Sequence, residues 1–166
     1  MGAAGTGRCG GERTVTLAVT LVTAAVLLIV VPNPSSLVAQ QPDIRGSWHA
    51  REYVLAGGDS HEVRGQIQFT MQDWLVLFFV MDGERPARGS AEGGRYTFEG
   101  DHLTFEHLHD FSVGEALPGL GESPLRMETR TAQGALEPAR AVVDGDRLTL
   151  YFPSGNYMTF DRGSPP

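Results

Sequence analysis

The chain has 166 residues, a formal net charge of −7 and a single cysteine, Cys9. One cysteine can build neither a disulfide framework nor a cysteine-rich zinc site, and an acidic chain lacks the basic surface that nucleic-acid binding requires. Hydrophobic residues make up 41% of the chain, which is enough for a packed core and argues against wholesale disorder. The length predicts one domain.

The N-terminal residues 1–39 have the features of an export signal. Arg8 and Arg13 precede an apolar run over residues 15–31, and Ala39 offers a small residue for cleavage. The run is also just long enough to span a bilayer, so an uncleaved N-terminal membrane anchor is the alternative. We therefore expect an exported protein, periplasmic or extracellular, that contacts a membrane only through residues 15–31 and only if they are retained.

Residues 40–45 are predicted to be a short linker, and from residue 46 onward polar and apolar residues alternate between frequent turn residues. This pattern is typical of short β-strands joined by turns. The first predicted strands are Gly46–Leu55, Glu62–Met71 and Trp74–Met81. Asp82–Gly94, which is rich in glycine, is predicted to be a loop.

The second half of the chain continues the same pattern. Arg95–Glu99 and His102–Asp110 are predicted to form a hairpin, and Phe111–Pro124 a long loop. The remaining predicted strands are Leu125–Thr131, Leu136–Val143, Arg147–Phe152 and Tyr157–Arg162. Pro138 favours an edge or a bulge because it cannot donate a ladder hydrogen bond. Residues 163–166 are predicted to be a disordered tail.

The fold class follows from these elements. After residue 42 no segment shows helical spacing of its apolar residues. Eight or nine short strands joined mostly by tight turns predict an all-β domain over residues 46–162, either a barrel or a sandwich. We favour an antiparallel up-and-down β-barrel, because closure removes the exposed strand edges that recruit other chains.

Three features together resemble a known family. Gly46-Ser47-Trp48 opens the first strand, Gly-Asp hairpins lie within Glu99–Phe105 and Asp144–Leu150, and Arg162 closes the last strand. In this order and spacing, roughly residues 44–162 resemble the bacterial lipocalin-like domain family of the calycin superfamily. The resemblance implies a barrel that is open at one end, with Trp48 plugging the closed end and Arg162 packing across it. Stacking of a guanidinium on an indole is favourable, especially when partly desolvated.

The strand Trp74–Met81 is unusual because both of its faces are apolar. One face carries Trp74, Val76, Phe78 and Val80, and the other carries Leu75, Leu77, Phe79 and Met81. We assign Phe79 to the interior and Phe78 to the outer face. Because large apolar patches are rarely left bare, we expect either the Phe111–Pro124 loop or a second subunit, as in a homodimer through this strand, to cover the outer face.

The candidate ligand-binding residues come from the faces assigned to the interior. They are Tyr53, Phe69, Phe79, Phe105, His107 and Phe152. Barrels of about eight strands hold either packed side chains or one small ligand, and an aromatic lining is typical of ligand pockets. We predict a small hydrophobic or amphipathic ligand, no cofactor and no metal.

His107 and His109 are the residues on which two alternatives to simple ligand binding depend. They lie two residues apart and are predicted to point the same way, as a metal-binding pair does, with His49, His61 or Glu128 as a third ligand. Either histidine could instead be the general base of a small isomerase, cyclase or hydratase. Since no nucleophile or phosphate-loop motif is present, the residues favour binding over catalysis. A filled barrel with a structural or interaction role at the cell envelope is the remaining alternative.

Overall fold

The computed structural model describes residues 42–163, which form nine β-strands. They are β1 Gly46–Val54, β2 Ser60–Phe69, β3 Asp73–Asp82, β4 Arg85–Glu99, β5 His102–Gly114, β6 Ser123–Thr129, β7 Ala135–Asp144, β8 Arg147–Tyr151 and β9 Tyr157–Arg162. Residues 42–163 include no helix long and apolar enough to cross a membrane. The predicted export signal, residues 1–39, lies outside the described residues.

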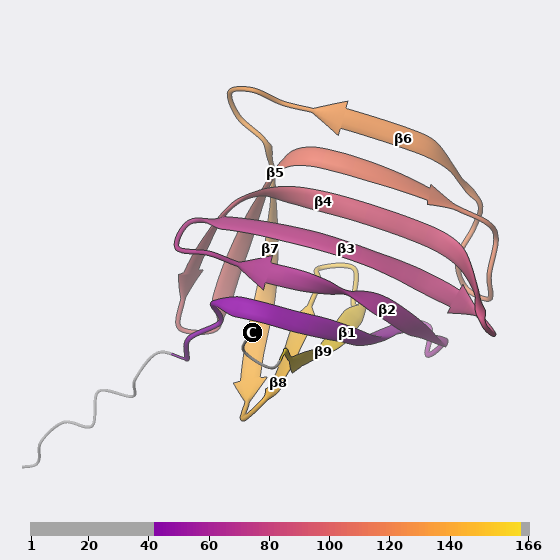
Figure 1. Ribbon diagram of the computed structural model, residues 1–166, viewed down its shortest axis with the longest axis horizontal. Coiled ribbons are helices and arrows are strands. Elements are labelled where there is room, and N and C mark those ends of the chain that lie inside the picture. Colours follow the sequence, from indigo (N-terminus) through magenta and orange to yellow (C-terminus); the bar gives the residue numbers. More distant parts are fainter. Residues whose placement is uncertain (1–41, 164–166) are drawn as a thin grey trace, which may run out of the picture. The chain divides into compact units, whose positions relative to one another are not determined.

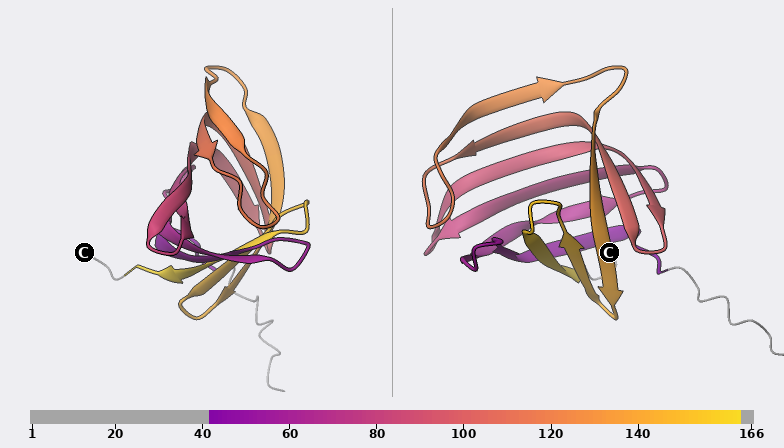
Figure 2. Two further views of the ribbon diagram at one scale, coloured as in Figure 1. Left: turned by 90° about the vertical axis from the view of Figure 1, so that its right-hand side faces the viewer. Right: turned by 180° about the vertical axis from the view of Figure 1, so that it is seen from behind.

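Eight of these strands close into an antiparallel barrel. The hydrogen-bonded order is β4-β3-β2-β1-β9-β8-β7-β5, and β5 pairs with β4 to complete the ring (Figures 1 and 2). The ninth strand, β6, is added to β5 outside the ring. Apart from β6, each strand pairs with the next along the chain. The predicted all-β, up-and-down barrel is therefore confirmed.

β4 runs through a segment that the sequence predicts to be a loop. Its glycines meet a packing requirement instead of forming turns, because side chains of β3 lean across them on the outer face. A Cβ atom at Gly89 would lie 3.3 Å from the ring of Phe79, and one at Gly93 would lie 3.1 Å from Leu75 Cδ1. The prediction of a loop over Asp82–Gly94 is therefore wrong from Arg85 onward.

β5 contains a bulge that changes the course of the sheet. Gly93 pairs with His109 and Gly94 with His107, so Leu108 is an extra residue without a partner on β4. A Cβ atom at Gly94 would overlap the carbonyl oxygen of Glu106, so only glycine fits opposite the bulge. Bulges bend a strand and reverse the faces of the residues that follow.

The same bulge marks a change of partner on the other edge of β5. His107 pairs with Ala135 of β7, whereas His109 pairs with Thr129 of β6. β6 and β7 thus pair with successive parts of the same edge of β5. Beyond β5 they diverge, and only β7 continues as a strand of the ring (Figure 1). Pro138 pairs only with β5, since pairing with β8 begins at Arg140, so it sits at a local edge as predicted.

From Trp74 to Val80 the two faces of β3 are the reverse of those predicted, whereas Met81, after a register shift with β4, is buried as predicted. Trp74, Val76 and Val80 are buried and Phe78 faces the interior, whereas the outward side chains Leu75, Leu77 and Phe79 are 56%, 46% and 39% exposed. Because both faces are apolar, alternation alone could not tell them apart. The expected cover by the Phe111–Pro124 loop is absent in the described residues, where β5 continues to Gly114.

The reversed faces can be tested with two neighbouring substitutions. Phe78→Glu is expected to lower the free energy of unfolding by about 2 kcal/mol, because it removes packing and puts a carboxylate on an apolar wall. Phe79→Glu is expected to cost less than about 1 kcal/mol, because its carboxylate remains in solvent. Urea unfolding followed by tryptophan fluorescence measures both; a larger loss for Phe79→Glu would contradict the assignment.

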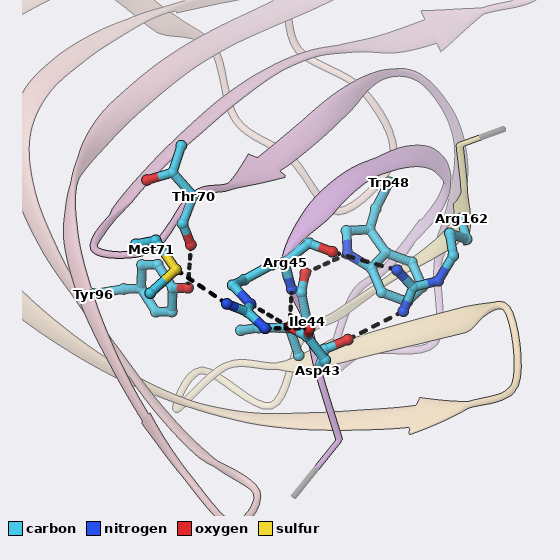
Figure 3. Close-up of polar contacts among 8 residues, drawn as sticks. All are labelled: Asp43, Ile44, Arg45, Trp48, Thr70, Met71, Tyr96 and Arg162. Carbon is cyan, nitrogen blue, oxygen red and sulfur yellow. Dashed lines mark hydrogen bonds and ion pairs between the residues drawn. The ribbon is translucent and has the colours of Figure 1, made fainter. Parts of the chain in front are cut away.

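Trp48 near the start of β1 and Arg162 at the end of β9 stack on each other. Trp48 is fully buried, its Nε1 donates a hydrogen bond to the carbonyl of Ile44 (2.7 Å), and the Arg162 guanidinium lies 4.1 Å from the ring centroid (Figure 3). This stacking agrees with the expected contact. Arg162 also donates to the carbonyls of Asp43 and Arg45, at 3.1 and 3.3 Å. The end of the predicted linker is therefore held against the barrel.

Candidate functional site

A cavity of about 350 Å³ lies inside the barrel. Much of its wall is apolar and comes from strands on opposite sides of the ring. These residues include Ile67, Val76, Val80, Leu150, Met158 and Phe160. They face inward because they occupy alternate positions of strands whose other residues face outward. The volume is near the lower end of the range of about 300–1,000 Å³ that is usual for small-molecule sites.

A polar cluster interrupts the apolar wall where β4, β5 and β7 meet. His107 Nδ1 lies 3.0 Å from Glu92 Oε2, and His107 Nε2 lies 3.0 Å from Glu137 Oε2. The hydroxyl of Ser90 donates to the other oxygen of Glu92 at 2.7 Å. The imidazole is thus held between two carboxylates, and its side chain is only 12% exposed.

The two carboxylates determine the protonation state of His107. Hydrogen bonds to Glu137 and to Glu92 raise its pKa to about 9, against the opposing effect of burial. Burial raises the pKa of Glu92, but its hydrogen bonds with His107 and Ser90 outweigh burial and leave the pKa below its ordinary value. At neutral pH His107 is therefore an imidazolium whose two N–H groups each face a carboxylate.

Trp74 brings an unsatisfied donor to the same wall. Its side chain is 4% exposed, and its Nε1 has no hydrogen-bond partner within residues 42–163. The indole packs on Phe105, with ring centroids 4.4 Å apart, and edge-on to His107, at 5.1 Å. A buried N–H without an acceptor costs about 1–3 kcal/mol.

The segment between β5 and β6 borders the cavity and is tied to the barrel. Arg88 Nη1 donates to the carbonyls of Glu115 and Gly121, at 2.5 and 2.7 Å. The ring of His61 on β2 is 3.0 Å from the carbonyl of Pro118. Leu120 of this segment lines the cavity. The segment predicted to cover the outside of β3 therefore contributes to the cavity wall instead.

The six predicted ligand-binding residues have three different placements. Tyr53, Phe105, His107 and Phe152 line the cavity. Phe69 is buried behind the wall, stacked against Phe105 with ring centroids 6.3 Å apart. Phe79 lies on the outer surface, because the faces of β3 were inverted in the prediction. That the four lining residues bind a ligand stays a prediction.

The predicted pairing of His107 and His109 is wrong. The bulge at Leu108 turns the chain between them, so His107 faces the cavity while His109 is exposed and contacts Thr129 Oγ1 at 2.9 Å. Glu128, a suggested third metal ligand, is engaged by Arg126 and Arg130. Within residues 42–163 no group of three or more His, Cys, Asp or Glu side chains is placed to hold a metal ion.

The most informative polar residues of the site were missed by sequence reasoning. Glu92 lies in the segment predicted to be a loop, and Glu137 lies beside Pro138 in a weakly patterned strand. Trp74 was assigned to the outer face. No local sequence pattern identifies Glu92 and Glu137, because they are distinguished only by lying close to His107 in the folded structure.

Comparisons with protein-family models, with curated proteins and with solved structures find no match to this chain.

Proposed function

We propose that this chain is an exported, lipocalin-like binding protein whose barrel takes up one small, mostly apolar molecule with a polar end. The observation that carries the proposal is the cavity of about 350 Å³, in which an apolar wall adjoins the polar cluster of Glu92, His107 and Glu137. Cavities that combine an apolar lining with a few convergent polar groups are typical of small-molecule sites.

The polar groups suggest how the ligand is oriented. A hydroxyl or amine group at its polar end would donate a hydrogen bond to Glu92 or Glu137, whose side chains line the cavity together with His107. The apolar remainder of the ligand would lie against residues such as Val76 and Leu150 on the cavity wall.

The alternatives receive less support. A general base must be unprotonated at the working pH, whereas the pKa of His107 is raised to about 9 and both of its ring nitrogens face carboxylates. His109 lies outside the cavity. A filled barrel is disfavoured by the size of the cavity. These observations favour a binding role over an isomerase, cyclase or hydratase and over a purely structural one.

Filling the cavity tests the proposal. Val76→Trp projects a large side chain into the cavity and is expected to weaken saturable binding of an environment-sensitive fluorescent fatty acid at least tenfold. Leu77→Trp is the matched control, because it adds the same side chain to the outer face of the same strand. Fluorescence titration of the full-length protein measures both, with circular dichroism to check folding.

The outcomes separate clearly. Native mass spectrometry of the exported protein is expected to find a co-purified small molecule, displaced stoichiometrically by the probe. Equal affinity of the probe for the wild type and Val76→Trp would place binding elsewhere. The absence of both a co-purified molecule and saturable probe binding would refute the proposed function.

A further inference from the structure

β6 leaves one of its edges open. Among the described strands it pairs only with β5. The amide of Arg130 donates to the carbonyl of Leu108 on β5 (2.8 Å), and backbone groups point alternately to the two edges of a strand. Over the regular part of the register, Arg126 and Glu128 therefore bond toward β5. Leu125, Met127 and Thr129 direct their N–H and C=O groups to the open edge.

The protection of this edge is incomplete: Arg126 and Glu128 are charged, but no described strand pairs with the open edge. Natural edge strands are blunted by proline, by charged side chains or by a covering segment. Pro124 falls where the register with β5 is irregular, between the pairs Ser112–Arg126 and Gly114–Ser123. The residues whose backbone faces the open edge include Leu125 and Met127, and their side chains are 59% and 70% exposed. A strand that exposes two large apolar side chains beside an open edge is suited to pairing with another strand.

The outer surface beside β6 is also apolar. Phe111 on β5 lies opposite Met127, and Leu77 on β3 lies opposite Ala91 on β4, which in turn pairs with Phe111. Phe111 and Leu77 are 39% and 46% exposed. The bulge at Leu108 exchanges the two faces of the rest of β5, so that Phe111 points outward and Asp110 inward. A second strand paired with the open edge of β6 would therefore extend a sheet whose outer face is already apolar.

The charges on β6 are complementary to those of a second copy of the chain, and this complementarity favours one register. Antiparallel pairing of β6 with itself places a two-fold axis at one residue. An axis at Arg126 sets that arginine opposite its own copy, and an axis at Glu128 does the same for the glutamate. Like charges directly opposite each other are destabilising. An axis at Met127 instead sets Arg126 opposite Glu128 of the second copy, twice.

We propose that two copies of this chain associate through antiparallel pairing of β6 with β6, centred on Met127. The Met127 backbones exchange their hydrogen bonds across the axis, and two Arg126–Glu128 pairs flank them. Leu125 lies opposite Thr129 of the second copy, so the pairing partly covers the most exposed apolar side chains of β6. This association is independent of ligand binding in the cavity.

A cysteine scan tests the register. In the full-length chain carrying Cys9→Ser, Met127→Cys is expected to form a disulfide-linked dimer, since opposed Cα atoms in a hydrogen-bonded pair are about 5.5 Å apart. Leu125→Cys is the matched control on the same face; its copies would be roughly 14 Å apart and beyond disulfide range. Cross-linking of Leu125→Cys to the same extent as Met127→Cys would overturn the register.

Charge reversal tests the partner. Chains carrying Arg126→Glu present only acidic side chains at the two flanking positions, and chains carrying Glu128→Arg present only basic ones. Each alone is expected to dimerise at least tenfold more weakly than the wild type, whereas their equimolar mixture forms a heterodimer. Sedimentation equilibrium measures the affinities. A wild-type monomer at all accessible concentrations, or single variants that dimerise like the wild type, would overturn the proposal.

Discussion

Trp48→Ala is expected to lower the free energy of unfolding by about 3–5 kcal/mol, the usual cost of removing a large aromatic side chain from a core. Trp48 is fully buried, its ring packs against the guanidinium of Arg162, and its Nε1 donates a hydrogen bond to the carbonyl of Ile44. The substitution therefore opens a cavity and also releases Asp43–Arg45 from the barrel. Urea unfolding of the full-length protein measures the loss.

Arg162→Met serves as the control for this prediction. It retains an apolar side chain over the indole but removes the cation–π contact and the hydrogen bonds to the carbonyls of Asp43 and Arg45. We expect a smaller loss, about 1–2 kcal/mol. If Trp48→Ala costs no more than Arg162→Met, this part of the barrel is stabilised by the arginine and not by burial of the indole.

His107→Leu is expected to destabilise the protein by about 3 kcal/mol at pH 7. Removing one partner of a buried ion pair leaves the other charge without compensation, and here Glu92 lies in the cavity wall with only Ser90 remaining as a donor. His109→Leu is the matched control, because His109 is exposed and its ring is hydrogen-bonded to the Thr129 hydroxyl. We expect it to cost less than about 0.5 kcal/mol.

The pH dependence of stability provides a second readout of the same cluster. The folded-state pKa of His107, about 9, exceeds its ordinary value of 6.5. The imidazolium therefore contributes fully below pH 6.5, and its contribution is lost as the pH rises through 9. Allowing for screening by cavity water, the decline amounts to about 2 kcal/mol. Glu92 acts in the opposite direction, since its lowered pKa makes its contribution disappear only at acidic pH.

Unfolding curves measured between pH 6 and 10 check this expectation. The decline should be present in the wild type and in His109→Leu, and absent in His107→Leu. A wild-type stability that is constant between pH 6.5 and 9 would show that His107 is not held as an imidazolium between the two carboxylates.

The strands themselves were largely predictable, and the reason is local. Alternation of polar and apolar residues is a property of each segment, and Gly-Asp turns such as those at Gly100 and Gly145, both with positive φ, mark where the chain reverses. Prediction failed for β4 because its glycines resemble turn residues. Their actual role depends on Phe79 and Leu75, which belong to a neighbouring strand.

The candidate site was less predictable than the fold. Tyr53, Phe105, His107 and Phe152 could be placed in the cavity wall from alternation alone. Phe79 could not, because β3 is apolar on both faces and a shift of one residue exchanges them. The two partners of His107 come from β4 and β7, so their proximity is created only when those strands pair with β5.

By itself the sequence predicted the all-β class and eight or nine strands, and the family resemblance implied the contact between Trp48 and Arg162. The tertiary structure alone decided which face of β3 is internal, where β5 bulges, and hence that His107 enters the cavity while His109 leaves it. The physical reason is that the alternation of polar and apolar residues is encoded within a strand. Which face of the strand points into the barrel, and its register, depend on the hydrogen bonds between strands. The bulge at Leu108 depends on Gly94, a residue on another strand that looked like part of a loop.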